Sequence, residues 1–180
     1  MRYFRVHTED ISYLTKQPRG LIKGIKDEDI DLCVNVIRES FGTVAKEFGF
    51  TEENAQRFTA FATDARRLHW HLKGEHRPMY GYFTENGLAG YYSLLLKGEQ
   101  ECELNNLCVL PEYRHQKIGE ELLLDAFVKA RECGCTKMTI GIVEENQVLR
   151  KWYESFGFLH TGTEKFDFFP FTCGYMEKML

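Results

Sequence analysis

The feature of the sequence that most constrains its fold is a change in hydrophobic period at Met79. Before this residue apolar side chains recur every three or four positions, and after it they gather in short runs. Two gaps between these runs are turn sequences, Glu85-Asn86-Gly87 and Gly98-Glu99-Gln100. Asn-Gly between apolar runs is a strong signal of a tight hairpin. Residues 79–84, 88–97 and 101–109 are therefore predicted to form a three-stranded antiparallel meander.

Helices and further strands are predicted on both sides of this meander. Before it we expect a short strand at 21–26, a helix with an apolar stripe from Ile30 to Phe41, and a second helix that starts near residues 51–54 and has its stripe from Phe58 to Leu72. After it we expect a helix at 118–134, a strand at 138–142, a helix at 146–156, and strands at 158–164 and 172–179. This order predicts an α/β fold with a mixed, mostly antiparallel central sheet and helices on both faces.

Length and charge narrow the classes of function. The 180 residues suit one domain, which we expect at residues 21–180 after an N-terminal extension of residues 1–20. The 23 Lys and Arg are outnumbered by 27 Asp and Glu, so the net charge is -4 and the basic excess that binds a nucleic-acid backbone is missing. The longest uncharged apolar stretch, residues 88–96, is far shorter than the roughly 20 residues of a membrane-spanning helix.

The first residues and the cysteines bear on the cellular compartment. Residues 1–7 carry charge where a secretion signal is apolar, which predicts a cytoplasmic, reducing location. The 6 cysteines are then expected to be free thiols. They contain no C-x-x-C pair, so no structural zinc site is predicted.

A segment rich in hydrogen-bond donors joins the meander to the next helix. It reads Leu107-Cys108-Val109-Leu110-Pro111-Glu112-Tyr113-Arg114-His115-Gln116-Lys117-Ile118-Gly119-Glu120. The free N–H groups of a helix start, the helix dipole and the charges of Arg114 and Lys117 converge there, and Gly119 lets a ligand approach the backbone closely. The segment therefore predicts an anion site, although an ordinary helix start would have a similar sequence. The patterns G-x-x-x-x-G-K-[ST] and G-x-G-x-x-G are both absent, which disfavours the two nucleotide-binding folds that use them.

A second segment places two polar residues on one helical face. Asn146 and Tyr153 are seven residues apart, which is two helical turns, so both could contact one extended ligand. In the simpler interpretation, Asn146 caps the helix and Tyr153 is a half-buried aromatic residue.

Together these two segments resemble the GNAT superfamily of acyl-CoA N-acyltransferases. Residues 114–119 match its acyl-CoA loop, [RQ]-x-x-G-x-[GA], and residues 146–158 match its later N-x6-Y-x3-G-F helix. The resemblance covers about residues 79–180 and departs from the family at Lys117, where the family has its first loop glycine. It implies a GNAT-like fold and acetyl-CoA as cosubstrate.

The resemblance also implies which residues contact the cosubstrate. In the family, the strand before the loop splays away from its parallel neighbour, and its backbone binds the pantetheine arm. The implied acyl-CoA-binding residues are Leu107, Cys108, Val109, Arg114, His115, Gln116, Lys117, Ile118, Gly119, Glu120, Asn146 and Tyr153.

The activity that the resemblance implies is N-acetyl transfer by direct attack of a primary amine in a ternary complex. An ammonium group with a pKa of about 10.4 must first lose a proton. Glu101 and Glu103 share one face of the strand and match the two positions at which family members have a base. Tyr153 matches the family tyrosine that donates a proton to the departing CoA thiolate. The alternative function is a catalytically silent acyl-CoA-binding sensor or interaction module.

Other features of the sequence bear on the acceptor and on rival chemistry. Acidic residues at 27–31, 99–103 and 144–145 would favour a cationic amine, in a small molecule or a peptide, if they border the acceptor cleft. His69 and His71 point to different sides of a helix, so no metal site is predicted. An acyl-cysteine route through Cys108 is disfavoured, because no histidine is placed by sequence to activate the thiol. The aromatic run 166–171 could line a pocket or a homodimer contact, but core packing is its more common use.

Overall fold

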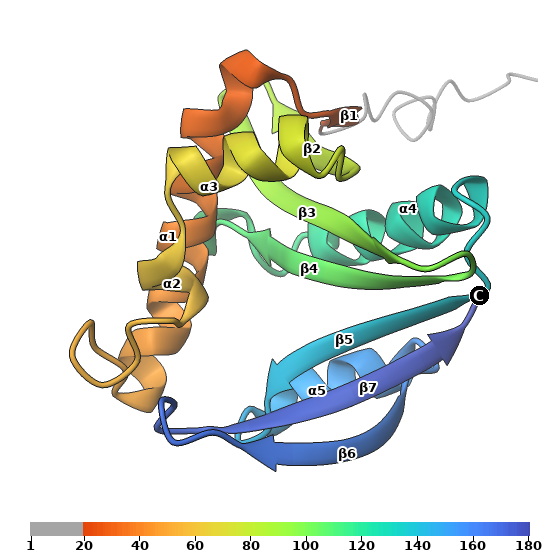
Figure 1. Cartoon of the computed structure of the whole chain (residues 1–180). Helices are drawn as coiled ribbons and strands as arrows, with labels where there is room; N and C mark the ends of the chain where they lie inside the picture. Colours follow the sequence, from red (N-terminus) through yellow and green to blue (C-terminus); the bar gives the residue numbers. More distant parts are fainter. Residues whose placement is uncertain (1–19) are drawn as a thin grey trace, which may run out of the picture.

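The computed structural model describes residues 20–180, which form a seven-stranded sheet in the order β1-β2-β3-β4-β5-β7-β6 (Figure 1). The expected N-terminal extension lies outside the described residues except for Gly20. The strands are β1 Leu21–Gly24, β2 Met79–Thr84, β3 Gly87–Lys97, β4 Glu101–Val109, β5 Lys137–Val143, β6 Leu159–Lys165 and β7 Thr172–Met179. The helices are α1 Ile30–Phe48, α2 Thr59–Ala62, α3 Ala65–His69, α4 Ile118–Glu132 and α5 Gln147–Ser155, with short turns η1 Asp27–Asp29, η2 Trp70–Gly74 and η3 Pro111–Tyr113.

The predicted mixed sheet is confirmed. Strands β2, β3 and β4 form the antiparallel meander, and among the strand pairs in residues 20–180 only β4 and β5 run parallel. Helix α4 connects these two strands, as a crossover between parallel neighbours requires.

Helices cover both faces of the sheet, as predicted. On one face α4 and α5 contribute Leu122 and Tyr153 to a core that includes Tyr92 of β3 and Ile140 of β5. On the other face α1 and α3 pack against β2 to β4 (Figure 1). None of the helices within 20–180 is both long and apolar enough to cross a bilayer.

The prediction of one continuous second helix was wrong. Residues 51–54 form a turn in which Thr51 and Asn54 hydrogen-bond to each other, and the helical residues divide into α2 and α3. Thr63 between them is extended, and the Asp64 carboxylate accepts a hydrogen bond from the Arg67 N–H at 2.7 Å. An Asp that caps a new helix competes with helix continuation, so the apolar period alone did not reveal the break.

Helix α1 connects the two parts of the sheet on its own face. Its first half packs Ile37 against β3 and β4, whereas its second half contributes Ala45 to a cluster with Val143 of β5 and Phe171 before β7. The αL residue Gly49 ends the helix at φ 70. One helix is therefore packed against both β4 and the end of β5.

Candidate functional site

The site begins where β4 and β5 separate. The two strands pair only over three positions, from Glu101 opposite Lys137 to Glu103 opposite Thr139, yet β4 continues to Val109 and β5 to Val143. Figure 1 shows the strands diverging from this short paired segment. Backbone groups on the β5 side of residues 104–109 have no strand partner in the described chain. Apart from the Val109 carbonyl, which accepts a side-chain hydrogen bond, they are available to an extended ligand.

A β-bulge in β4 changes which side chains face α1. Tyr91 pairs with Cys108 and Ser93 with Asn105, so Asn106 and Leu107 together lie opposite one residue of β3. Asn106 has φ 55, a conformation that Asn tolerates better than most residues. The extra residue shifts the alternation, so that Leu107 and Val109 pack on the α4 side and Cys108 on the α1 side.

The loop after β4 leads to a helix start without a side-chain cap. Lys117 is the N-cap residue of α4 and its side chain makes no capping bond. The first backbone bond of the helix runs from the Glu121 N–H to the Lys117 carbonyl at 3.0 Å. The N–H groups of Ile118, Gly119 and Glu120 have no acceptor within residues 20–180, and with the helix dipole they form an anion site.

Two non-glycine residues of this loop are left-handed. His115 has φ 59 and Lys117 has φ 67. Lys117 therefore adopts the backbone conformation of a glycine while carrying a side chain, at a cost of about 1–2 kcal/mol. The sequence departure at this position keeps the turn, and it adds an exposed ammonium beside the free N–H groups.

Arg114 is anchored to the protein rather than turned outward. Its Nη2 donates to the Ser40 carbonyl and to Thr43 Oγ1, both at 3.0 Å, and its Nε donates to the Val109 carbonyl at 3.2 Å. The guanidinium thus holds the loop against the middle of α1. Only the guanidinium N–H groups that make none of these hydrogen bonds could bind a phosphate.

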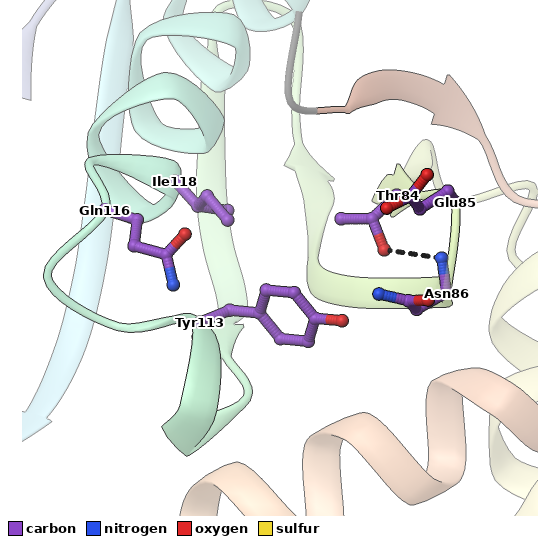
Figure 2. A pocket seen from close by; sticks show the side chains of 6 residues that line it. All are labelled: Thr84, Glu85, Asn86, Tyr113, Gln116 and Ile118. Carbon is purple, nitrogen blue, oxygen red and sulfur yellow. Dashed lines mark hydrogen bonds between the residues drawn. The ribbon is translucent and has the colours of Figure 1, made fainter.

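A pocket lies between this loop and the β2–β3 hairpin (Figure 2). Its lining residues are Thr84, Glu85, Asn86, Tyr113, Gln116 and Ile118. The Tyr113 ring points toward Asn86, while Gln116 and Ile118 border the start of α4. The pocket therefore adjoins the first residue of α4.

Asn146 and Tyr153 have different environments. The Asn146 side chain accepts a hydrogen bond from the Leu149 N–H at 3.0 Å, so it caps α5, which was the simpler interpretation. Tyr153 is only 6% exposed and packs against Phe158. Burial, together with the nearby Cys108, raises the pKa of Tyr153, which keeps the phenol protonated. Its hydroxyl has no hydrogen-bond partner in the described chain and is available as a donor.

The Cys108 thiol is poorly suited to nucleophilic attack. It is 8% exposed, and burial raises its pKa to about 12 despite the nearby Ser40 hydroxyl and Arg114 charge. A reactive cysteine needs the opposite shift. This environment argues against an acyl-cysteine route.

Both candidate bases are ion-paired. Glu101 lies 2.6 Å from the ammonium of Lys137. Glu103 pairs with Lys97 of β3, and its Oε1 accepts a hydrogen bond from the Asn105 amide at 2.8 Å. Glu103 is the last β4 residue paired with β5, so it lies at the point where the strands separate.

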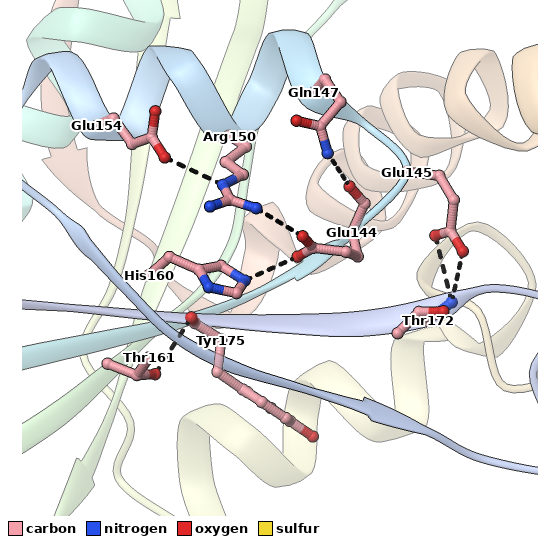
Figure 3. Close-up of polar contacts among 9 residues, drawn as sticks. All are labelled: Glu144, Glu145, Gln147, Arg150, Glu154, His160, Thr161, Thr172 and Tyr175. Carbon is pink, nitrogen blue, oxygen red and sulfur yellow. Dashed lines mark hydrogen bonds and ion pairs between the residues drawn. The ribbon is translucent and has the colours of Figure 1, made fainter.

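The β5 side of the opening is held by a polar network (Figure 3). Glu144 contacts Arg150 at 2.6 Å and His160 at 3.0 Å, and Glu145 accepts hydrogen bonds from the Thr172 N–H. Asp27, far along the chain, pairs with His69 and Lys73. The acidic residues that would favour a cationic acceptor are thus mostly paired and do not form one cluster.

The remaining sequence candidates have other environments. His69 is half-exposed, whereas His71 is 7% exposed, and no group of three metal-ligating side chains occurs in residues 20–180. In the aromatic run, Phe169 and Phe171 pack into the cluster below α1, and Phe168 is 45% exposed. Core packing therefore accounts for part of this run.

Two polar residues of the site were not identified from the sequence. Arg77 is nearly buried and donates to Asn105, the neighbour of Glu103 on the same face of β4. Two consecutive Asn in an expected strand, Asn105 and Asn106, were an available signal, because Asn is depleted in strands. Nothing in the local pattern distinguishes Arg77 from an exposed arginine.

The chain is similar to known proteins of one family. Residues 44–158 match the Acetyltransferase (GNAT) family. An uncharacterized N-acetyltransferase of Mycobacterium tuberculosis is 26% identical over 113 residues, which is 63% of this chain and 66% of that protein. Spermidine N(1)-acetyltransferase of Thermoplasma acidophilum is 32% identical over 88 residues, 49% of this chain and 54% of that protein. The matches thus span from about half to just under two thirds of these relatives.

Solved structures share the fold. The PaiA N-acetyltransferase of Thermoplasma acidophilum, in complex with coenzyme A, has a TM-score of 0.76 at 24% identity over 89% of this chain and 99% of that chain. The ribosomal-protein-S18-alanine N-acetyltransferase of Escherichia coli has a TM-score of 0.69 at 15% identity over 88% and 92% of the two chains.

Proposed function

Because the chain belongs to the GNAT acetyltransferase family, we propose that it transfers the acetyl group of acetyl-CoA to a primary amine by direct attack in a ternary complex. The observation that carries this proposal is the uncapped N-terminus of α4 beside the separation of β4 and β5. Solved relatives in this fold contain coenzyme A or acetyl-CoA, which supports the choice of cosubstrate.

In this proposal the chain binds the two ends of the cosubstrate with different groups. The N–H groups of Ile118, Gly119 and Glu120 and the ammonium of Lys117 bind the pyrophosphate, which carries negative charge. Backbone groups of residues 107–109 that have no strand partner on the β5 side bind the pantetheine arm, apart from the Val109 carbonyl, which Arg114 already contacts. A backbone N–H there also stabilises negative charge that develops on the thioester carbonyl oxygen. Acetyl-CoA supplies an acyl group that is already activated as a thioester.

Two side chains handle protons in the proposed reaction. Glu103 removes a proton from the amine through water, since it lies two residues, about 6–7 Å along the strand, closer to the opening than Glu101. Tyr153 is the proposed donor to the departing thiolate, because its hydroxyl has no partner among the described residues and its raised pKa keeps the phenol protonated. Asn146 contributes by starting α5 and so orienting Tyr153.

The acceptor is proposed to be a primary amine, and a polyamine is the first candidate. Partial identity to a spermidine N(1)-acetyltransferase supports this choice more than charge does, because the acidic residues are mostly paired. As part of the same proposal, residues 21–180 form a single domain, and the protein is cytoplasmic, where its six free cysteines would stay reduced.

A second candidate function is a catalytically silent acyl-CoA sensor. The ion pairs at Glu101 and Glu103 favour it, since each carboxylate already contacts a lysine ammonium that a catalytic base would have to release. Both functions include acetyl-CoA binding, so only turnover separates them.

The deciding experiment measures thermal stability with and without acetyl-CoA and then thiol release over a panel of amines. The panel contains spermidine, a lysine peptide, a peptide with an N-terminal alanine and a neutral amino acid. A saturable stabilisation with turnover supports the enzyme, and stabilisation without turnover supports the sensor. No stabilisation would overturn the cosubstrate assignment.

Variants then test the roles of the side chains. Glu103→Gln and Tyr153→Phe should each lower kcat about 100-fold while leaving the Kd of acetyl-CoA within twofold. Glu101→Gln tests the other carboxylate. A larger loss in Glu101→Gln than in Glu103→Gln would reassign the base.

A further inference from the structure

A chain of hydrogen bonds connects a buried arginine to Glu103. The Arg77 side chain is 7% exposed and lies between η2 and β2. Its Nε and Nη2 donate to Glu75 Oε2 at 2.9 and 2.5 Å, and its Nη1 donates to Asn105 Oδ1 at 2.8 Å. Glu75 thus balances the guanidinium charge, and the third donor reaches β4.

The chemistry of Arg77 sets the orientation of the Asn105 amide. A guanidinium can only donate, so the amide oxygen must face Arg77 and the NH2 group must face away from it. That NH2 group donates to Glu103 Oε1 at 2.8 Å, and a carboxylate can only accept. The hydrogen bonds therefore run in one direction only, from Arg77 to Asn105 and from Asn105 to Glu103.

The surroundings of this series are unusually polar for the interior of a sheet face. The Tyr91 hydroxyl, Ser93 Oγ and His71 Nδ1 are buried and have no hydrogen-bond partner in the described structure. Ser93 lies opposite Asn105, and the Arg77 charge acts on both Tyr91 and His71. A buried arginine is costly to keep in such a place unless its bonds are satisfied.

We propose that Arg77 is a positioning residue of the active site, which holds the Glu103 carboxylate in place through Asn105. This inference rests on the proposed function and deepens it. The Asn105 bond holds Oε1, which leaves Oε2, paired with the 44% exposed Lys97 side chain, as the oxygen that accepts the proton in this proposal. Glu101 has no such support, because its carboxylate pairs with the ammonium of Lys137.

Asn105→Asp is the sharpest test, because it replaces one NH2 group by oxygen and leaves the size of the side chain almost unchanged. The Arg77 bond is kept, whereas the donor to Glu103 becomes a second negative charge. The substitution leaves unchanged the other charged and titratable groups around Glu103, which are Lys97 on β3, Glu101 on β4, Lys137 on β5, Tyr175 and Glu177 on β7, and Arg77. The titration midpoint of the Glu103 carboxyl should rise by about one pH unit or more, and the acidic limb of kcat/KM for the amine should move with it.

Arg77→Lys tests the other end of the series. Lysine keeps the charge but cannot hold Glu75 and Asn105 with a fork of donors. We expect kcat/KM for the amine to fall about tenfold, with the Kd of acetyl-CoA within twofold of the wild type. Arg66→Lys is the matched control, since Arg66 is exposed and its side chain is outside this network.

Two readouts keep the inference separate from the proposed function. The carboxyl carbon of Glu103 is followed by NMR in the protein without ligand, with Glu103→Gln to assign it, so this measurement does not require turnover. A Glu103 midpoint that is equal in the wild type and Asn105→Asp overturns the inference, as does a shifted midpoint with an unchanged pH profile of kcat/KM. If the wild type acetylates no amine, the proposed function fails, and the role of Arg77 in catalysis fails with it. A merely structural role of Arg77 predicts lower stability in Arg77→Lys, with kcat/KM for the amine and its pH profile unchanged in that variant.

Discussion

Lys117 allows the backbone and charge contributions of the anion loop to be separated. It has φ 67 and ψ 3 at the N-cap of α4, and its side chain makes no capping bond. Lys117→Gly removes both the side chain and the strain, whereas Lys117→Ala removes the ammonium but keeps the strained conformation. The difference in the free energy of unfolding between the two variants therefore measures the effect of the backbone conformation alone.

The expected magnitude follows from two opposing effects. A left-handed residue other than glycine costs about 1–2 kcal/mol, and glycine loses about 0.5–1 kcal/mol through its greater freedom in the unfolded chain. Lys117→Gly should therefore be more stable than Lys117→Ala by about 0.5–1 kcal/mol, which corresponds to a Tm difference of about 1–4 °C.

The assay is urea unfolding of both variants at neutral pH, with Gly49→Ala as a reference. Gly49 has φ 70, and a Cβ there would meet no atom within 4 Å, so this variant measures the conformational cost at nearly the same dihedral angle. It should lose about 1 kcal/mol. If Lys117→Gly is less stable than Lys117→Ala, the left-handed geometry of the loop is refuted.

Binding of CoA gives the second half of the test. If the N–H groups of α4 carry most of the pyrophosphate affinity, both Lys117 variants should raise the Kd of CoA by the same factor of about 2–5, as loss of one exposed charge does. This factor should shrink at high salt. A 100-fold loss in both variants would instead make the ammonium the main ligand.

Three further predictions concern stability. Gly90→Ala would bring a Cβ to 2.8 Å from Leu122 Cδ1 and 3.0 Å from the Cys108 carbonyl oxygen. The free energy of unfolding, measured in urea, should therefore fall by about 1–3 kcal/mol. A change below about 0.5 kcal/mol would contradict this packing. Asp64→Ala removes the bond to the Arg67 N–H at 2.7 Å and should cost about 1 kcal/mol, whereas a gain in stability would indicate that the break between α2 and α3 is not held by this cap. Burial lowers the pKa of His71 to about 4 from 6.5, so below pH 6.5 the unfolded chain binds a proton that the folded chain does not, and stability is lost as the pH falls from 6.5 to 4. His71→Gln should reduce the loss measured between pH 7 and pH 5, and an equal loss in both proteins would exclude His71 as its source.

The sequence by itself determined the order and type of nearly all elements, because local interactions decide them. The Asn-Gly turn at residues 86–87 specified the β2–β3 hairpin, and the apolar stripe of residues 118–130 specified α4. The loop of residues 114–120 was recognisable for the same reason, since a strand end, a short loop and a helix start are contiguous in the chain.

Only the tertiary structure decided how the polar side chains are used, because their partners come from distant segments. Arg114 binds α1 through Ser40 and Thr43, more than seventy residues away in sequence. Glu103 and Arg77 are connected only because the β4 bulge and the pairing of β3 with β4 bring Asn105 between them. A hydrophobic period specifies which face of a strand is buried, but the partner of a charge depends on packing between strands and helices, which no local pattern encodes.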